Sequence, residues 1–141
     1  MKQLLDLDSF TKALCDKGYD GYFTTQAAYP GKLKDSISEY LEACAKGAEP
    51  LKTELFLMGY LEWSGDDKPS VECMLWVKHE KGNFELQKMD IVRKDQFGLP
   101  LKHCSLRDLS SESLPKASEA IALVKEAAAQ KTIQSARRFK F

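Results

Sequence analysis

The feature that most constrains this chain is a series of apolar segments, separated by turn residues, that runs from residue 53 to residue 104. In these segments apolar residues alternate with other residues, a pattern typical of strands. Glycine, aspartate, asparagine and proline fill the gaps between them. Consecutive strands joined by short loops pair antiparallel. We therefore expect a β-meander of about four strands, at Thr53–Trp63, Val71–His79, Phe84–Arg93 and Leu101–Cys104.

Helical patterns lie on both sides of this meander in the sequence. The first runs from about Ser9 to Lys17 after an expected N-cap at Asp8, and the second runs from about Lys32 to Lys46. A third begins near Pro115, because proline is favoured in the first turn of a helix. Between the first two helices, Tyr22–Thr25 has the composition of a short edge strand. The sequence thus predicts an α+β fold in which two N-terminal helices and one C-terminal helix accompany an antiparallel sheet.

The chain has 141 residues, the length of one domain, and its 21 basic residues balance its 21 acidic residues. This balance excludes the overall basic field that is typical of proteins that bind duplex DNA. Basic residues nevertheless gather at the C-terminus, where no acid follows Glu126. We expect residues 1–130 to form a single domain and residues 131–141 to form a basic tail. The cations of this tail are Lys131, Arg137, Arg138 and Lys140.

Neither a signal peptide nor a transmembrane segment is evident in the sequence. The N-terminal residues contain no sufficiently long apolar run, and acids interrupt them at Asp6 and Asp8. No later stretch is long and apolar enough to span a bilayer. We therefore expect a cytoplasmic protein without a membrane partner, in which the four cysteines are free thiols.

The pairing register of the strands decides which side chains share a face of the sheet. A hairpin that turns at residues 81–82 sets Lys78 opposite Glu85, a favourable charge pair. A compatible first hairpin sets Trp63 opposite Val71. One face then forms an apolar core that helices must cover. This expected core face consists of Leu55, Leu57, Leu61, Trp63, Val71, Cys73, Leu75, Val77, Phe84 and Leu86.

The other face of the expected sheet is also apolar. It collects Phe56, Met58, Tyr60, Met74, Trp76, Met89 and Ile91. An antiparallel sheet with one solvated face should carry polar residues there. The cover of this second face is one of the chain's own helices, a second copy of the protein, or a ligand such as nucleic acid. This register also places Lys88 and Asp90 on the core face, a conflict that a β-bulge near Lys88 would resolve.

Residues that could carry chemistry do not form a recognisable motif. Cys73, His79, His103 and Cys104 lack metal-ligand spacing, and no nucleophile elbow or glycine-rich phosphate loop occurs. The neighbours His103 and Cys104 point to opposite faces if they lie on a strand, so they cannot act as a dyad. We expect neither a metal site nor a cofactor. An enzyme would require a pocket in which His79 or His103 meets a carboxylate or a thiol.

Three function hypotheses follow. The first is a small non-enzymatic binding or accessory module that forms a homodimer, or binds a further protein partner, through the second face or the sheet edge. The alternative is a module that binds single-stranded nucleic acid through Tyr60, Trp76 and the basic tail. Acids near the strand ends, among them Glu62 and Glu72, oppose that alternative because they repel phosphates. The third hypothesis is an enzyme that acts on a small substrate without a known motif.

Overall fold

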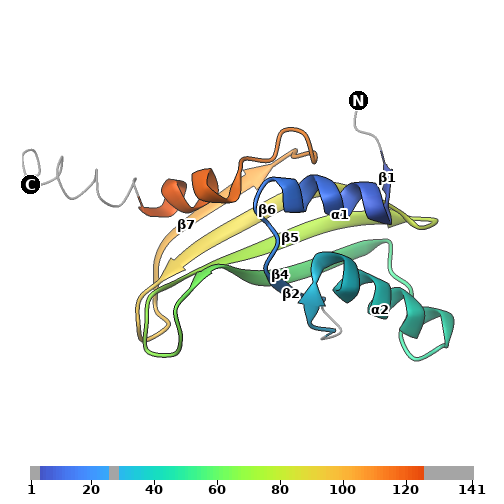
Figure 1. Cartoon of the computed structure of the whole chain (residues 1–141), viewed down its shortest axis with the longest axis horizontal. Coiled ribbons are helices and arrows are strands. Elements are labelled where there is room, and N and C mark those ends of the chain that lie inside the picture. The colour runs from blue at the N-terminus through green and yellow to red at the C-terminus, as the bar shows by residue number, and fades with distance from the viewer. Residues whose placement is uncertain (1–3, 26–28, 126–141) are drawn as a thin grey trace, which may run out of the picture.

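The computed structural model describes residues 4–25 and 29–125, and within these residues the fold is α+β (Figure 1). The N-terminal elements are β1 (Leu5–Asp6), α1 (Leu7–Asp16), β2 (Tyr22–Thr25), β3 (Gly31–Lys32) and α2 (Leu33–Ala45). The remaining strands are β4 (Glu54–Trp63), β5 (Ser70–Glu80), β6 (Asn83–Lys94) and β7 (Pro100–Arg107). A third helix, which we call the C-terminal helix, begins at residue 117 and covers the described residues up to 125.

The strands form one antiparallel sheet in the order β1-β6-β5-β4-β2-β3, and β7 also pairs with β6. β4 to β7 are the expected meander, so the fold class is confirmed. The estimate of about four strands is too low, because β1, β2 and β3 join the same sheet. Strands of two to four residues contain too little alternation to be recognised in a sequence. The segment Tyr22–Thr25 is a strand as expected, but it lies between β3 and β4 rather than at the edge.

The helices form where they were predicted, with small shifts at their ends. Helix α1 is capped by Asp6 rather than Asp8, since the Asp6 carboxylate accepts a hydrogen bond of 2.7 Å from the backbone N–H of Ser9. This bond lowers the pKa of the Asp6 carboxyl. Gly18, with φ of +100°, follows the helix in a conformation that favours glycine.

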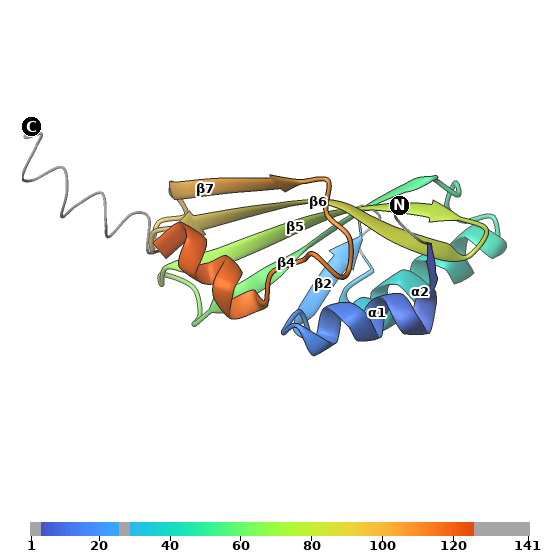
Figure 2. The same cartoon turned by 90° about the horizontal axis from the view of Figure 1, so that it is seen from above.

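All three described helices lie on the same face of the sheet (Figure 2). Their apolar residues join those of the strands in a single buried cluster. The helix residues of this cluster are Phe10, Leu14, Leu33, Ile37, Tyr40, Ala120 and Val124. The expectation that helices could cover both faces is therefore wrong for the described helices, since no helix within residues 4–25 and 29–125 lies over the opposite face of the sheet.

A bulge at Gln87 determines which residues of β6 enter the core. Val77 pairs with Leu86, but Trp76 pairs with Lys88, so the register shifts by one residue between them. The bulge predicted near Lys88 is thus confirmed. It turns Met89 into the core, where that residue is fully buried.

The assignment of Met89 and Ile91 to the second face is wrong for this reason. Both side chains are fully buried beneath the helices, and Lys88 and Asp90 take the positions on the other face. A one-residue slip moves every following side chain to the opposite face, so the correction applies to the rest of β6.

A second irregularity, in β4, was not predicted. The register shifts between Tyr60 and Glu62, so Trp63 pairs with Ser70 and not with Val71. Trp63 consequently lies outside the core, with 57% of its surface exposed. Its assignment to the core face is wrong because the bulge at Leu61 reverses the alternation of the strand end.

We predict that Cys73 is the only one of the four cysteines that requires unfolding before it reacts with a thiol reagent such as DTNB. All four thiols are free, but Cys73 is buried on β5, whereas the others are half-buried. Burial raises the pKa of the Cys73 thiol, and the Asp90 carboxylate acts in the same direction, so the reactive thiolate is scarce. Thiols are counted before and after addition of denaturant. A Cys73→Ala variant should lose only the late-reacting thiol, and simultaneous reaction of four thiols in the native protein would contradict the prediction.

Among the described residues, none of the helices combines the length and the apolar character needed to cross a bilayer.

Candidate functional site

The candidate site is the sheet face opposite the helices, which we call the open face. Strand alternation and the two bulges determine which side chains lie on it. Its residues are Tyr22, Thr24, Glu54, Phe56, Met58, Tyr60, Trp63, Ser70, Glu72, Met74, Trp76, Lys78, Glu85, Lys88, Asp90, Val92, Lys94, His103, Ser105 and Arg107.

The β4 and β5 side of the open face is apolar and aromatic. Phe56 is paired with Trp76, and their ring centroids lie 4.9 Å apart. Met58 of β4 is likewise the strand partner of Met74 of β5. Of the seven residues predicted for this face, five are brought together here: Phe56, Met58, Tyr60, Met74 and Trp76.

Two further aromatic residues of the open face were missed in the sequence. Tyr22 is 70% exposed and reaches the face from β2, and Trp63 lies 6.0 Å from Tyr60 between ring centroids. Trp63 could have been found only by locating the β4 bulge. The position of Tyr22 on the open face depends on the pairing of β2 with β4, which brings together segments far apart in the sequence.

The β6 and β7 side of the open face carries charges, and two of its lysines are paired with acids within the chain. Lys94 forms an ion pair of 2.7 Å with Glu72 of the neighbouring strand. Lys88 lies 4.0 Å from Asp90, and its ammonium is also 4.4 Å from the centroid of the Trp76 ring. Such pairing neutralises the local field, so the face offers no block of like charge.

His103, Asp90 and Ser105 also meet on this side, but their hydrogen bonds are wrong for a catalytic triad. The Ser105 hydroxyl donates to Asp90 Oδ1 at 2.6 Å. The same Nε2 of His103 lies 3.4 Å from Ser105 Oγ and 3.8 Å from Asp90 Oδ2. In a triad the carboxylate binds the other ring nitrogen, which leaves Nε2 to take the proton of the nucleophile. The cluster therefore supplies the Asp90 carboxylate with a hydrogen-bond donor and does not activate the Ser105 hydroxyl as a nucleophile.

His79 has a structural role at the far end of β5. The ring stacks on Phe84 with centroids 4.9 Å apart. Nε2 accepts a hydrogen bond from the backbone N–H of Gly82, and Nδ1 lies 3.3 Å from the carbonyl oxygen of Lys52. These contacts use both ring nitrogens, so neither is left for chemistry.

The four residues considered as metal ligands do not converge. Cys73 and His79 are buried on the core face, whereas His103 lies on the open face. Within residues 4–25 and 29–125, no group of three or more histidine, cysteine or acidic residues is arranged to hold a metal ion.

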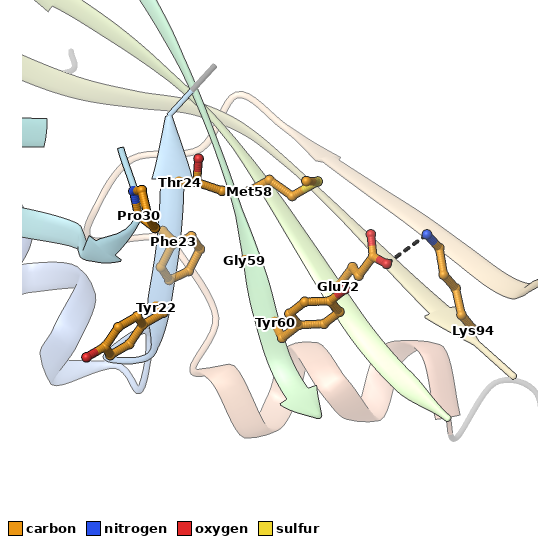
Figure 3. Close-up of a pocket in the computed structure, with 9 residues that line it drawn as sticks. All are labelled: Tyr22, Phe23, Thr24, Pro30, Met58, Gly59, Tyr60, Glu72 and Lys94. Carbon is orange, nitrogen blue, oxygen red and sulfur yellow. Dashed lines mark ion pairs between the residues drawn. The ribbon is translucent and has the colours of Figure 1, made fainter. Parts of the chain in front are cut away.

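The open face is hollowed where β4 passes Tyr22 (Figure 3). One hollow of about 430 Å³ is lined by Tyr22, Phe23, Thr24, Pro30, Met58, Gly59, Tyr60, Glu72 and Lys94. A second hollow of about 510 Å³ is lined by Tyr22, Tyr60, Leu61 and Trp63. Both volumes are in the range of ligand pockets. Since the hollows share Tyr22 and Tyr60, we call them together the aromatic groove.

The predicted basic tail, with Lys131, Arg137, Arg138 and Lys140, lies outside the described residues.

No protein-family model, curated protein or solved structure matches the chain.

Proposed function

We propose that this chain is a non-enzymatic interaction module that forms a homodimer by stacking the open faces of two copies. One observation carries the proposal. The described helices all lie on one face of the sheet, while the other face presents a continuous aromatic and methionine surface from β4 and β5. Apolar patches of this kind on a protein surface mark interfaces. Two antiparallel sheets that stack face to face bury such residues between them.

The charge on the open face favours a copy of the same chain as the partner. Lys78, Lys88, Lys94 and Arg107 are balanced by Glu54, Glu72, Glu85 and Asp90. A face with no net charge does not repel its own copy, as a two-fold interface requires. The same balance gives less support to single-stranded nucleic acid, because binding to phosphates needs an excess of cations.

The position of Trp76 suits the centre of such an interface. Trp76 lies on β5, which has β4 on one side and β6 on the other. A residue near the two-fold axis meets its own copy or a close neighbour, and large aromatic residues at such positions contribute most to affinity.

We predict that Trp76→Glu converts the dimer to a monomer of 15.9 kDa. The glutamate would have Lys88 beside it in the monomer, so folding should survive, but stacking would bury the charge. Loss of a central aromatic anchor corresponds to a dissociation constant raised roughly 30-fold or more. Light scattering over a concentration series measures the mass.

Phe97→Glu is the matched control, because Phe97 is an exposed aromatic residue in the β6–β7 turn, outside the strands that form the open face. This variant should remain dimeric. A wild-type chain that is monomeric at all concentrations, or a Trp76→Glu variant that dimerises as well as wild type, would exclude this interface.

A further inference from the structure

The aromatic groove has the length and shape to hold a short extended segment. It follows β4 from Met58 to Trp63, a distance of roughly 17 Å at about 3.3 Å per residue. Tyr22 and Tyr60, which Figure 3 shows in the first hollow, also line the second. Trp63 lines the second hollow near the end of β4. The rings of Tyr60 and Trp63 lie 6.0 Å apart between centroids, so the groove has an aromatic wall at this end of β4.

The groove also supplies hydrogen-bond donors. Within the described residues, the hydroxyls of Tyr22 and Tyr60 and the indole N–H of Trp63 make no hydrogen bond. Each of these groups can donate to a carbonyl oxygen. A ligand of the groove is therefore expected to present apolar surface together with carbonyl oxygens that lack an internal partner.

A peptide that adds as a further β-strand fits this site poorly. Strand addition requires a regular edge with a continuous ladder of backbone groups. The bulge at Leu61 interrupts that edge within the groove, since it lies between the paired residues Tyr60 and Glu62. Recognition must then depend on the aromatic side chains rather than on the backbone of β4.

A polyproline II helix meets these requirements. It has no internal hydrogen bonds, so its carbonyl oxygens are open to outside donors, and its proline rings pack against aromatic walls. With about 3.1 Å per residue, five or six residues span the groove. We propose that the aromatic groove binds a proline-rich segment of a partner protein in the polyproline II conformation.

This chain does not contain such a segment itself. Its five prolines, at positions 30, 50, 69, 100 and 115, are widely separated. The charged residues that line the groove, Glu72 and Lys94, neutralise each other at 2.7 Å. The partner segment is therefore selected by its prolines rather than by its charge, and its binding should depend little on salt.

The test uses the Trp76→Glu variant of the full chain, in which Trp63 is the only tryptophan left of the two. Its fluorescence then reports the groove alone. The probe is a ten-residue peptide of Pro-Pro-Leu repeats, and the control peptide has alanine in place of every proline. We expect saturable binding of the first peptide, at least roughly tenfold weaker binding of the second because alanine loses the preformed conformation, and little change between low and high salt.

Tyr22→Ala in the same background identifies the site. Tyr22 is largely exposed, so its loss should leave the fold intact but weaken peptide binding roughly tenfold or more. Phe97→Ala is the matched control and should bind like its parent.

The peptide experiments would overturn the proposal if the proline peptide did not bind, if the alanine peptide bound equally well, or if Tyr22→Ala left binding unaffected. Salt-sensitive binding of a single-stranded oligonucleotide that displaces the peptide would also overturn it, in favour of a nucleic-acid site. Tyr22, Tyr60 and Trp63 belong both to the groove and to the open face, so the homodimer and the peptide compete for this surface, and the Trp76→Glu background separates the two tests. If the wild-type chain is monomeric, the peptide test stands unchanged. If the peptide does not bind, the mass measurement still decides the homodimer proposal.

Discussion

Phe84→Ala is expected to lower the free energy of unfolding by roughly 3–5 kcal/mol, the largest effect that we predict for a single substitution. Phe84 is fully buried, and its ring lies 5.7 Å from that of Phe10 and 4.9 Å from that of His79. It thus joins helix α1 to the end of β5. The same residue pairs through its backbone with Leu5 of β1. Truncation leaves a cavity between the Phe10 ring, which helix α1 carries, and the His79 ring, which the strand ladder holds in place, so little relaxation can offset the loss.

Urea denaturation monitored by circular dichroism measures the effect. Phe97→Ala is the control, because Phe97 is 78% exposed and the same atoms are removed without a cavity. Its unfolding free energy should change by less than about 0.5 kcal/mol. If the two variants lost equal stability, the position of Phe84 at the centre of the core would be wrong.

The long strands could be predicted because each alternates over ten or so residues and ends in clear turn signals. The register of the β5–β6 hairpin next to its turn was predicted, since Lys78 pairs with Glu85 as expected. The two-residue strands β1 and β3 could not, because their pairing depends on distant segments of the chain. The N-cap of α1 was misplaced since Asp6 and Asp8 both precede an apolar stripe, and only the bond to Ser9 distinguishes them.

The two bulges differ in how visible they are in a sequence. A regular β6 would have buried Lys88 and Asp90, and the free-energy cost of burying these charges revealed the bulge at Gln87. A regular β4 would have buried Trp63, which is an acceptable core residue, so nothing indicated the bulge at Leu61. A register error that buries an apolar side chain does not conflict with the hydropathy pattern, so it cannot be detected in the sequence. For this reason the apolar half of the open face was largely predicted, whereas the aromatic groove was not.

Gly59→Ala is expected to lower the free energy of unfolding by roughly 1–3 kcal/mol, because no space exists for a Cβ atom at this position. An added Cβ would lie 2.5 Å from the carbonyl oxygen of Tyr22 and 2.7 Å from the ring of Phe23. The first of these atoms belongs to the backbone of β2, so the strand itself must move. Gly59 has no positive φ that would favour glycine, and the steric contact alone therefore decides the outcome.

Gly21→Ala is the matched control, since it is the other glycine without a positive φ, and its Cβ would lie 3.6 Å from the nearest atom, in ordinary contact. Both substitutions lower the conformational entropy of the unfolded chain equally. The difference between their unfolding free energies therefore measures the effect of the steric clash alone. Amide hydrogen exchange at Phe23–Thr25 should accelerate in Gly59→Ala and stay unchanged in Gly21→Ala.

Because Gly59 also lines the aromatic groove, displacement of β2 moves Tyr22 away from Tyr60. Peptide binding should then weaken in Gly59→Ala, and equal stability of the two variants would show that the close packing of β2 on β4 is wrong.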